Sequence, residues 1–165
     1  MCELLINILG TIIGGLILTF FLFLINEFIF SKKNLTGEWQ TTTQTKKTTY
    51  NPYVDLKIEY KIHLIQKGYE LSGSGEKVKD IMPNGDETVF LREKRVNIDI
   101  DGYFERRYFR KSKVYLNITE EGRIRESRST YVLTLKTKNT LLGNFISTAA
   151  DSSGIVNMTK CDPNS

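Results

Sequence analysis

Hydrophobic and polar positions divide the chain into a short apolar segment and a long polar one. The apolar segment holds 23 consecutive uncharged residues, from Leu4 to Asn26. A helix rises about 1.5 Å per residue, so this run spans roughly 35 Å, enough for a hydrocarbon core of about 30 Å. The pattern predicts one transmembrane helix in residues 1–30 and a separate domain in residues 31–165.

A secretory signal peptide is the alternative for the apolar segment. A signal peptide has a positive n-region, an apolar core of about 7–15 residues and a small-residue cleavage site. Here Met-Cys-Glu precedes a longer core, and Asn-Glu-Phe-Ile-Phe follows it. These features favour an uncleaved anchor.

Residues 31–165 alternate between apolar and polar side chains, as β-strands do. In the clearest run, 54–66, every second residue from Val54 to Leu64 is aliphatic or aromatic. A period of two places these residues on one buried face of a strand. Similar runs, separated by turn sequences such as Pro83-Asn84-Gly85-Asp86, occur at 37–45, 69–79, 87–92, 96–104, 114–118, 131–135, 141–148 and 154–160.

About eight strands with short connections predict an all-β fold, a small antiparallel up-and-down β-barrel preceded by one transmembrane helix. A meander of this size removes its exposed edges by closing on itself. A two-sheet sandwich is the alternative, but the sequence shows no long Greek-key connection. The interior of an eight-stranded barrel holds side chains or one small ligand, so we expect function inside the barrel or at its mouth.

Charge is distributed as unevenly as hydropathy. The 165-residue chain has a net charge of +4, yet its first 30 residues hold only Glu3 and Glu27 and no Lys or Arg. Lys32 and Lys33 follow the span, so the positive-inside rule places the barrel in the cytoplasm and the N-terminus outside.

The two cysteines lie at opposite ends, which excludes a disulfide scaffold. With His63 the only histidine, we expect no metal site, no cofactor and no enzyme activity.

The span contains a small-residue motif. Gly10 and Gly14 form a G-x-x-x-G, and Asn7 lies on the same helical face. Small residues let helices approach closely, and an asparagine can form a hydrogen bond across the pair. The motif predicts self-association of the helix, unless the glycines are simply those common in membrane helices.

Gly37-Glu38-Trp39, at the start of the first strand, resembles the G-x-W of lipocalins. In lipocalins this tryptophan plugs the closed end of the barrel. The resemblance implies a lipocalin-like barrel with Trp39 as its plug, although an aromatic ring can also stack on a ligand.

The whole layout resembles the membrane effectors of CBASS anti-phage systems. The segments that carry the resemblance are 35–39, directly after the anchor, and the terminal 142–145 and 154–156. In that family the barrel binds a cyclic dinucleotide, and the effector then oligomerises and disrupts the bacterial inner membrane, which causes abortive infection. The resemblance implies a single-pass inner-membrane protein whose partners are the lipid bilayer, a cyclic dinucleotide and further copies of itself, with no long nucleic acid. The family has two transmembrane helices, whereas residues 4–30 have room for one.

A cyclic dinucleotide needs cations for its phosphates and flat surfaces for its bases. On a continuous strand Phe104, Arg106, Tyr108 and Arg110 share one face, which makes Arg106 and Arg110 the candidate phosphate ligands and Tyr108 a stacking surface. If the strand ends near Gly102, the same residues form a solvated loop or contact anionic lipids. Tyr60 and Tyr131, on apolar strand faces, are further ligand-binding candidates because their hydroxyl groups need partners.

Two other functions fit the same pattern. A membrane-tethered lipocalin-like carrier or adaptor would hold a lipid or another small apolar ligand. A structural membrane subunit would have a filled barrel and no ligand.

Overall fold

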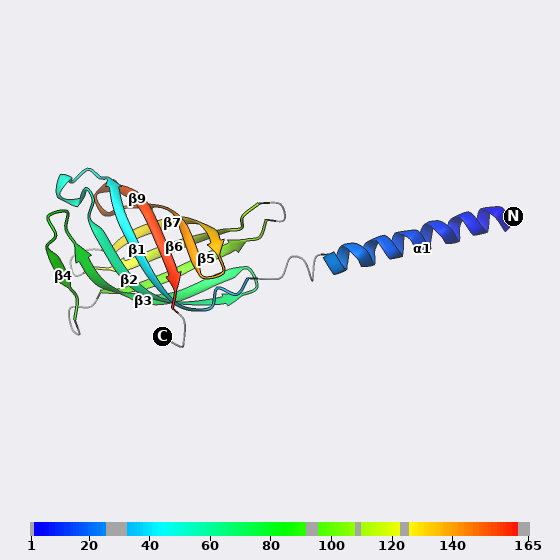
Figure 1. Cartoon of the computed structure of the whole chain (residues 1–165), viewed down its shortest axis with the longest axis horizontal. Helices are drawn as coiled ribbons and strands as arrows, with labels where there is room; N and C mark the ends of the chain where they lie inside the picture. The colour runs from blue at the N-terminus through cyan, green and yellow to red at the C-terminus, as the bar shows by residue number, and fades with distance from the viewer. Residues whose placement is uncertain (1, 26–32, 92–95, 108–109, 123–125, 162–165) are drawn as a thin grey trace. The chain divides into compact units, whose positions relative to one another are not determined.

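The computed structural model describes residues 2–25, 33–91, 96–107, 110–122 and 126–161. The chain divides into two compact units, Met1–Lys33 and Asn34–Ser165. The first contains one α-helix, α1 (Cys2–Leu24), and the second contains the strands (Figure 1). Within α1, the segment Ile6–Leu24 is long and apolar enough to cross a membrane.

The strands of the second unit form a closed antiparallel barrel. Nine strands lie in the described residues: β1 (Gly37–Lys47), β2 (Lys57–Lys67), β3 (Glu70–Ile81), β4 (Glu87–Val89), β5 (Val96–Glu105), β6 (Lys113–Glu121), β7 (Glu126–Thr137), β8 (Thr140–Ser147) and β9 (Ser152–Lys160). Their order is β2-β1-β9-β8-β7-β6-β5-β3-β4, and a pairing of β2 with β3 closes the sheet. Eight strands thus form the wall, and β4 is a short addition to β3 (Figure 1). The predicted up-and-down barrel is confirmed.

The start of β2 differs from the predicted strand 54–66. Asp55 has a left-handed backbone with φ of 60°, and a 3-10 turn, η2 (Asn51–Tyr53), precedes it. Such a conformation interrupts a strand, so β2 begins only at Lys57. Val54 is consequently exposed, whereas Leu56 is buried.

The apolar core fills one half of the barrel. The inward side chains nearest the start of β1 include Leu35, Leu64, Leu71, Phe104, Val114, Leu116, Leu133, Leu141 and Met158, and the same cluster extends to Tyr60, Tyr131 and Phe145 beside the other half. Trp39 lies among them with no exposed surface, and its indole N–H donates a 2.8 Å hydrogen bond to the carbonyl of Leu35. This half of the barrel has the large apolar side chains that an eight-stranded interior needs to fill it.

Candidate ligand-binding site at the polar end of the barrel

The barrel interior changes from apolar to polar along its axis. On β1 the inward residues are Trp39 followed by Thr41, Thr43 and Thr45, all of them buried. On β7 the inward sequence changes in the same sense, from Leu133 and Tyr131 at one end to Ser129 and Ser127 at the other. Because β1 and β7 lie in different parts of the wall, the polar half is a property of the interior and not of one strand.

A cavity of about 300 Å³ opens at this polar end. Two features distinguish its lining from that of a lipid carrier: several hydroxyl groups and a cluster of charged side chains. The residues that carry these groups are Thr43, Thr45, Tyr53, Tyr60, Lys77, Asp80, Glu120, Ser127, Ser129, Tyr131, Ser147 and Ser152.

A β-bulge explains how two charged residues of β3 reach the interior. Tyr60 pairs with Lys77 and its neighbour Glu59 pairs with Lys79, so Val78 is an extra residue in β3. Residues three apart on a regular strand face opposite sides of the sheet. One extra residue between them brings both side chains to the same side. Lys77 and Asp80 therefore both point inward, opposite Tyr60 and Ile58 respectively.

Lys77 is the centre of a mostly buried charge network. Its ammonium group lies 2.9 Å from a carboxylate oxygen of Asp80 and 3.8 Å from one of Glu120. The hydroxyl group of Tyr60 donates a 3.1 Å hydrogen bond to Glu120. The ring of Phe90, just after β4, lies 5.0 Å from the same ammonium group, which favours a cation–π contact.

Burial dominates the electrostatics of this network. It raises the pKa of Asp80 above its ordinary value even though Lys77 acts in the opposite direction. It also raises the pKa of Tyr60 and of Tyr131, with smaller contributions from the Glu120 carboxylate. One ammonium group and two carboxylates leave the network one negative charge in excess when all three groups are ionised.

Two buried polar atoms near this end have no hydrogen-bond partner among the described residues. They are Oδ1 of Asp80 and Oγ1 of Thr41, which is the register partner of Tyr60. A buried polar group without a partner costs about 1–3 kcal/mol, so native structures retain few of them. Asp80 lines the cavity, so its carboxylate offers acceptors to a ligand with hydrogen-bond donors.

The rim of the polar end is held by contacts between connections that are far apart in sequence. The carbonyl of Ala150 accepts hydrogen bonds of 2.9 Å from the backbone N–H of Thr49 and 3.0 Å from the hydroxyl group of Thr48. Ala150 and Asp151 have left-handed backbones, with φ of 52° and 44°. The β1–β2 and β8–β9 connections are thus joined at one side of the opening.

The residues singled out from the sequence fall into separate groups. Tyr60 and Tyr131 line the polar cavity. Arg106 and Arg110 follow the end of β5, whose start pairs with Lys77. The two ends of β5, a strand of 10 residues, are about 30 Å apart. The structure does not bring these arginines together with the tyrosines.

The predicted inward face of the arginine segment ends at Phe104. That side chain is buried in the core, but β5 stops at Glu105, so Arg106 and Arg110 do not continue the strand. Arg106 is half-buried and Arg110 is exposed; Tyr108 lies outside the described residues. Arg107 binds both carboxylate oxygens of Glu105, at 2.7 and 3.0 Å.

The helix residues Asn7, Gly10 and Gly14 lie within α1, and all three are exposed. The hydroxyl group of Thr11 donates a 2.9 Å hydrogen bond to the carbonyl of Asn7. A side chain at Gly10 or Gly14 would meet nothing within 4 Å. This surface of α1 is open to a partner helix, and self-association stays a prediction.

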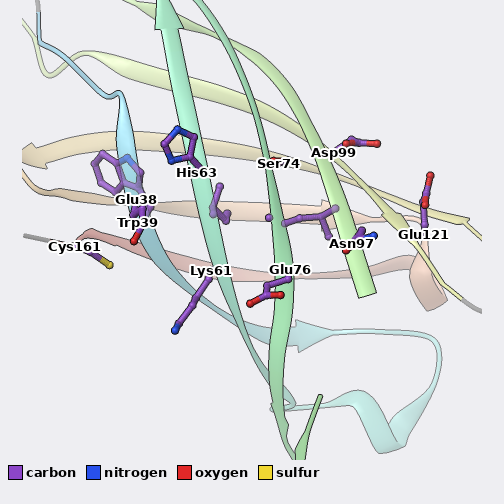
Figure 2. A pocket seen from close by; sticks show the side chains of 13 residues that line it. Glu38, Trp39, Lys61, His63, Ser74, Glu76, Asn97, Asp99, Glu121 and Cys161 are labelled. Atoms are coloured by element: carbon purple, nitrogen blue, oxygen red, sulfur yellow. The ribbon is translucent and has the colours of Figure 1, made fainter. Parts of the chain in front are cut away.

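A second hollow, of about 720 Å³, lies on the outer face of the barrel over β1, β2, β3 and β5 (Figure 2). Glu38, His63, Ser74 and Asp99 form one row of register partners across these strands. The row places two carboxylates, those of Glu38 and Asp99, at exposed positions. No group of three or more metal-ligating side chains occurs in the part of the chain that the structure describes.

The polar cavity has a sequence signal that the strand patterns alone do not reveal. Hydroxyl residues recur at every second position, at Thr41, Thr43 and Thr45 and again at Ser127 and Ser129. An inward face made of hydroxyl groups is unusual, because interiors are mostly apolar. Asp80 has no such signal, because its inward direction depends on the bulge at Val78. Lys77 and Glu120 continue the alternation of their own strands, but the pattern does not reveal that they meet inside the barrel.

Comparisons with known proteins find likeness in fold only. No known protein family and no curated protein matches the sequence. Among solved structures, the redesigned β-barrel mFAP0 bound to DFHBI is 13% identical with a TM-score of 0.48, over 77% of this chain and 98% of that one. EF1p2_mFAP2b bound to DFHBI is 10% identical with a TM-score of 0.49, over 78% of this chain and 94% of that one.

Proposed function

We propose that this protein is a membrane-anchored receptor whose barrel binds a small polar molecule in the cavity around Lys77. The observation that carries the proposal is the division of the interior, where a filled apolar half supports an open polar half. Charged groups inside a barrel are costly unless they are paired or meet a ligand. A charged cluster kept there, with an unpaired acceptor on Asp80 among the described residues, is therefore better explained by binding than by stability.

The lining defines the class of ligand. The cavity of about 300 Å³ lies at the lower end of the range for small-molecule sites, roughly 300–1,000 Å³. Asp80 and Glu120 offer acceptors, Lys77 offers a donor and Tyr131 and Phe145 offer aromatic surfaces. A flat heterocycle with exocyclic donors, such as a nucleobase, matches these groups.

The more specific proposal is that the ligand is a cyclic dinucleotide and that the protein is a CBASS-type effector. The support for it is the resemblance in sequence layout together with a cavity suited to one base. The two phosphates would stay outside the cavity, away from Asp80 and Glu120. Ligand binding would then drive oligomerisation and disruption of the bacterial inner membrane, with the barrel on the cytoplasmic side.

A carrier for fatty acids fits the structure less well. An apolar chain needs an apolar tunnel, but hydroxyl and charged side chains lie among the apolar ones, Leu56, Ile58, Met82 and Phe145, that line the open half. The apolar half is occupied by Trp39 and its neighbours. Without a vacant apolar interior, burial of a lipid tail gains little.

A thermal-shift screen of the full chain in detergent tests the proposal. At 100-fold over its dissociation constant a ligand stabilises the fold by about 2.7 kcal/mol, which raises the melting temperature by about 10 °C for a barrel of this size. We expect such a shift with one cyclic dinucleotide and none with fatty acids.

Variants locate the site. Lys77→Met and Tyr131→Phe should each reduce the shift, and Tyr131→Phe removes only one hydroxyl group, so the fold is retained. Lys79→Met is the matched control, because Lys79 pairs with Glu87 at 3.1 Å and does not line the cavity. A shift that persists in both cavity variants would exclude this site, and a shift with fatty acids alone would favour the carrier.

A further inference from the structure

The outer face of β7, β8 and β9 contains a compact apolar cluster centred on an asparagine. Asn144 has Val132 and Ile155 as its register partners on either side. Leu142 and Ile146 lie two positions away on the same strand and face the same way. All four apolar side chains are exposed: 39% for Val132, 48% for Ile155, 37% for Leu142 and 70% for Ile146.

These side chains form one contiguous surface. Register partners have Cβ atoms about 4.5–5.5 Å apart, and residues two apart on a strand are separated by roughly 7 Å. Solvent-exposed apolar residues are ordinary when they are scattered, but a contiguous group of this kind marks an interaction surface.

The same face also has a hollow. A groove of about 420 Å³ is lined by Leu142, Gly143, Ile155 and Val156, together with Thr42, Gln44, Asn157 and, from β2, Lys57. Ile146, the most exposed side chain of the cluster, projects from the neighbouring part of β8. The face therefore offers both a projecting side chain and a recess.

Charge indicates which partner this face fits. The outward residues in the central parts of four neighbouring strands carry no charge: Thr130, Val132 and Thr134 on β7, Leu142, Asn144 and Ile146 on β8, Ser153, Ile155, Asn157 and Thr159 on β9, and Gln40, Thr42 and Gln44 on β1. The charged residue that lines the groove is Lys57, the register partner of Gln44 on the adjoining strand β2. By contrast, Lys61, Glu76, Asp99 and Asp101 point outward from β2, β3 and β5. A charged partner would gain nothing from the neutral face, and would lose solvation there.

We propose that this face pairs two barrels of this protein about a two-fold axis near Asn144. A two-fold interface places the same surface on both subunits, so a neutral face meets a neutral face and a projection can enter its partner's recess. An asparagine side chain has both a donor and an acceptor, so two of them near the axis can form reciprocal hydrogen bonds. The pairing does not depend on which ligand occupies the polar cavity.

Cysteine cross-linking of the full chain in membranes tests the pairing. In a background with Cys2 and Cys161 replaced by serine, Asn144→Cys places two thiols near the proposed axis. A disulfide requires Cβ atoms about 3.8 Å apart, so it forms readily only where the two positions meet. Asn97→Cys, an exposed position on the charged side of the barrel, is the matched control.

We expect a disulfide-linked dimer with Asn144→Cys and none with Asn97→Cys. Adding Ile146→Asp to Asn144→Cys should lower the dimer at least about tenfold, because it buries a charge in an apolar contact. Ile146 is mostly exposed, so the melting temperature should not change. No dimer with Asn144→Cys, equal dimers at both positions, or a dimer insensitive to Ile146→Asp would each overturn the proposal.

Discussion

Replacement of Lys77 by methionine tests whether the charge network behaves as its geometry implies. Met has a similar length and no charge, so the change leaves Asp80 and Glu120 without their common counterion. The side chains of the three residues are only 12%, 18% and 21% exposed, so solvent replaces little of the lost interaction. Removing one partner of a buried ion pair lowers the free energy of unfolding by about 3–5 kcal/mol. Because the cavity is open on one side, we expect a loss at the lower end of this range, about 3 kcal/mol at pH 7.

The free energy of unfolding that Lys77→Met removes should depend on pH in a defined direction. Burial already raises the pKa of Asp80 in the folded protein above its unfolded value. The folded state therefore binds the proton more tightly, and stability falls as the pH rises from the unfolded pKa through the folded one. Loss of Lys77 raises the folded pKa further, so the variant should lose most stability at neutral pH and recover when Asp80 is protonated.

Urea denaturation of the full chain in detergent provides the measurement, with the fluorescence of Trp39, the only tryptophan, as the probe. We expect a destabilisation of about 3 kcal/mol at pH 7 that falls to about 1 kcal/mol near pH 4. Lys79→Met should change stability by less than about 0.5 kcal/mol at both pH values, because its partner Glu87 is 49% exposed. An equal cost for Lys77→Met at both pH values would refute the reasoning.

Three further perturbations test other parts of the structure. Trp39→Phe removes the hydrogen bond to Leu35 and leaves a small cavity, so thermal denaturation should show a loss of about 2–3 kcal/mol; no loss would mean that the plug is not closely packed. Arg106→Ala and Arg110→Ala should leave the ligand-induced thermal shift unchanged if the cavity around Lys77 is the site, and loss of the shift would move the site to the β5–β6 connection. Gly14→Ile should reduce cross-linking between α1 helices about tenfold while the melting temperature of the barrel stays constant, and unchanged cross-linking would exclude this helix face.

The barrel could be predicted from the sequence because alternation is a local property of each strand. Ile62 and Leu64 alternate with Lys61 and His63 over a long run, and the structure places the first pair inside and the second outside. Short turns between such runs leave few topologies other than a meander. Local breaks were harder to predict: Val54 continues the pattern but lies outside, because Asp55 adopts a left-handed backbone.

The candidate site was predicted only in part. Tyr60 and Tyr131 were identified because each belongs to an inward face. Lys77 and Asp80 were not, because their shared direction depends on the bulge at Val78, which a period of two cannot reveal. The separation of Arg106 from the cavity likewise depends on where β5 ends, and the basic and aromatic composition of that segment does not mark the end of the strand.

A crystal structure of the protein with the compound that gives the largest thermal shift tests the central claim most directly. The account predicts that the ligand lies in the polar end of the barrel, within hydrogen-bonding distance of Lys77 and of the Asp80 carboxylate. A ligand bound in the outer hollow of Figure 2, or beside Arg106 and Arg110, would contradict it.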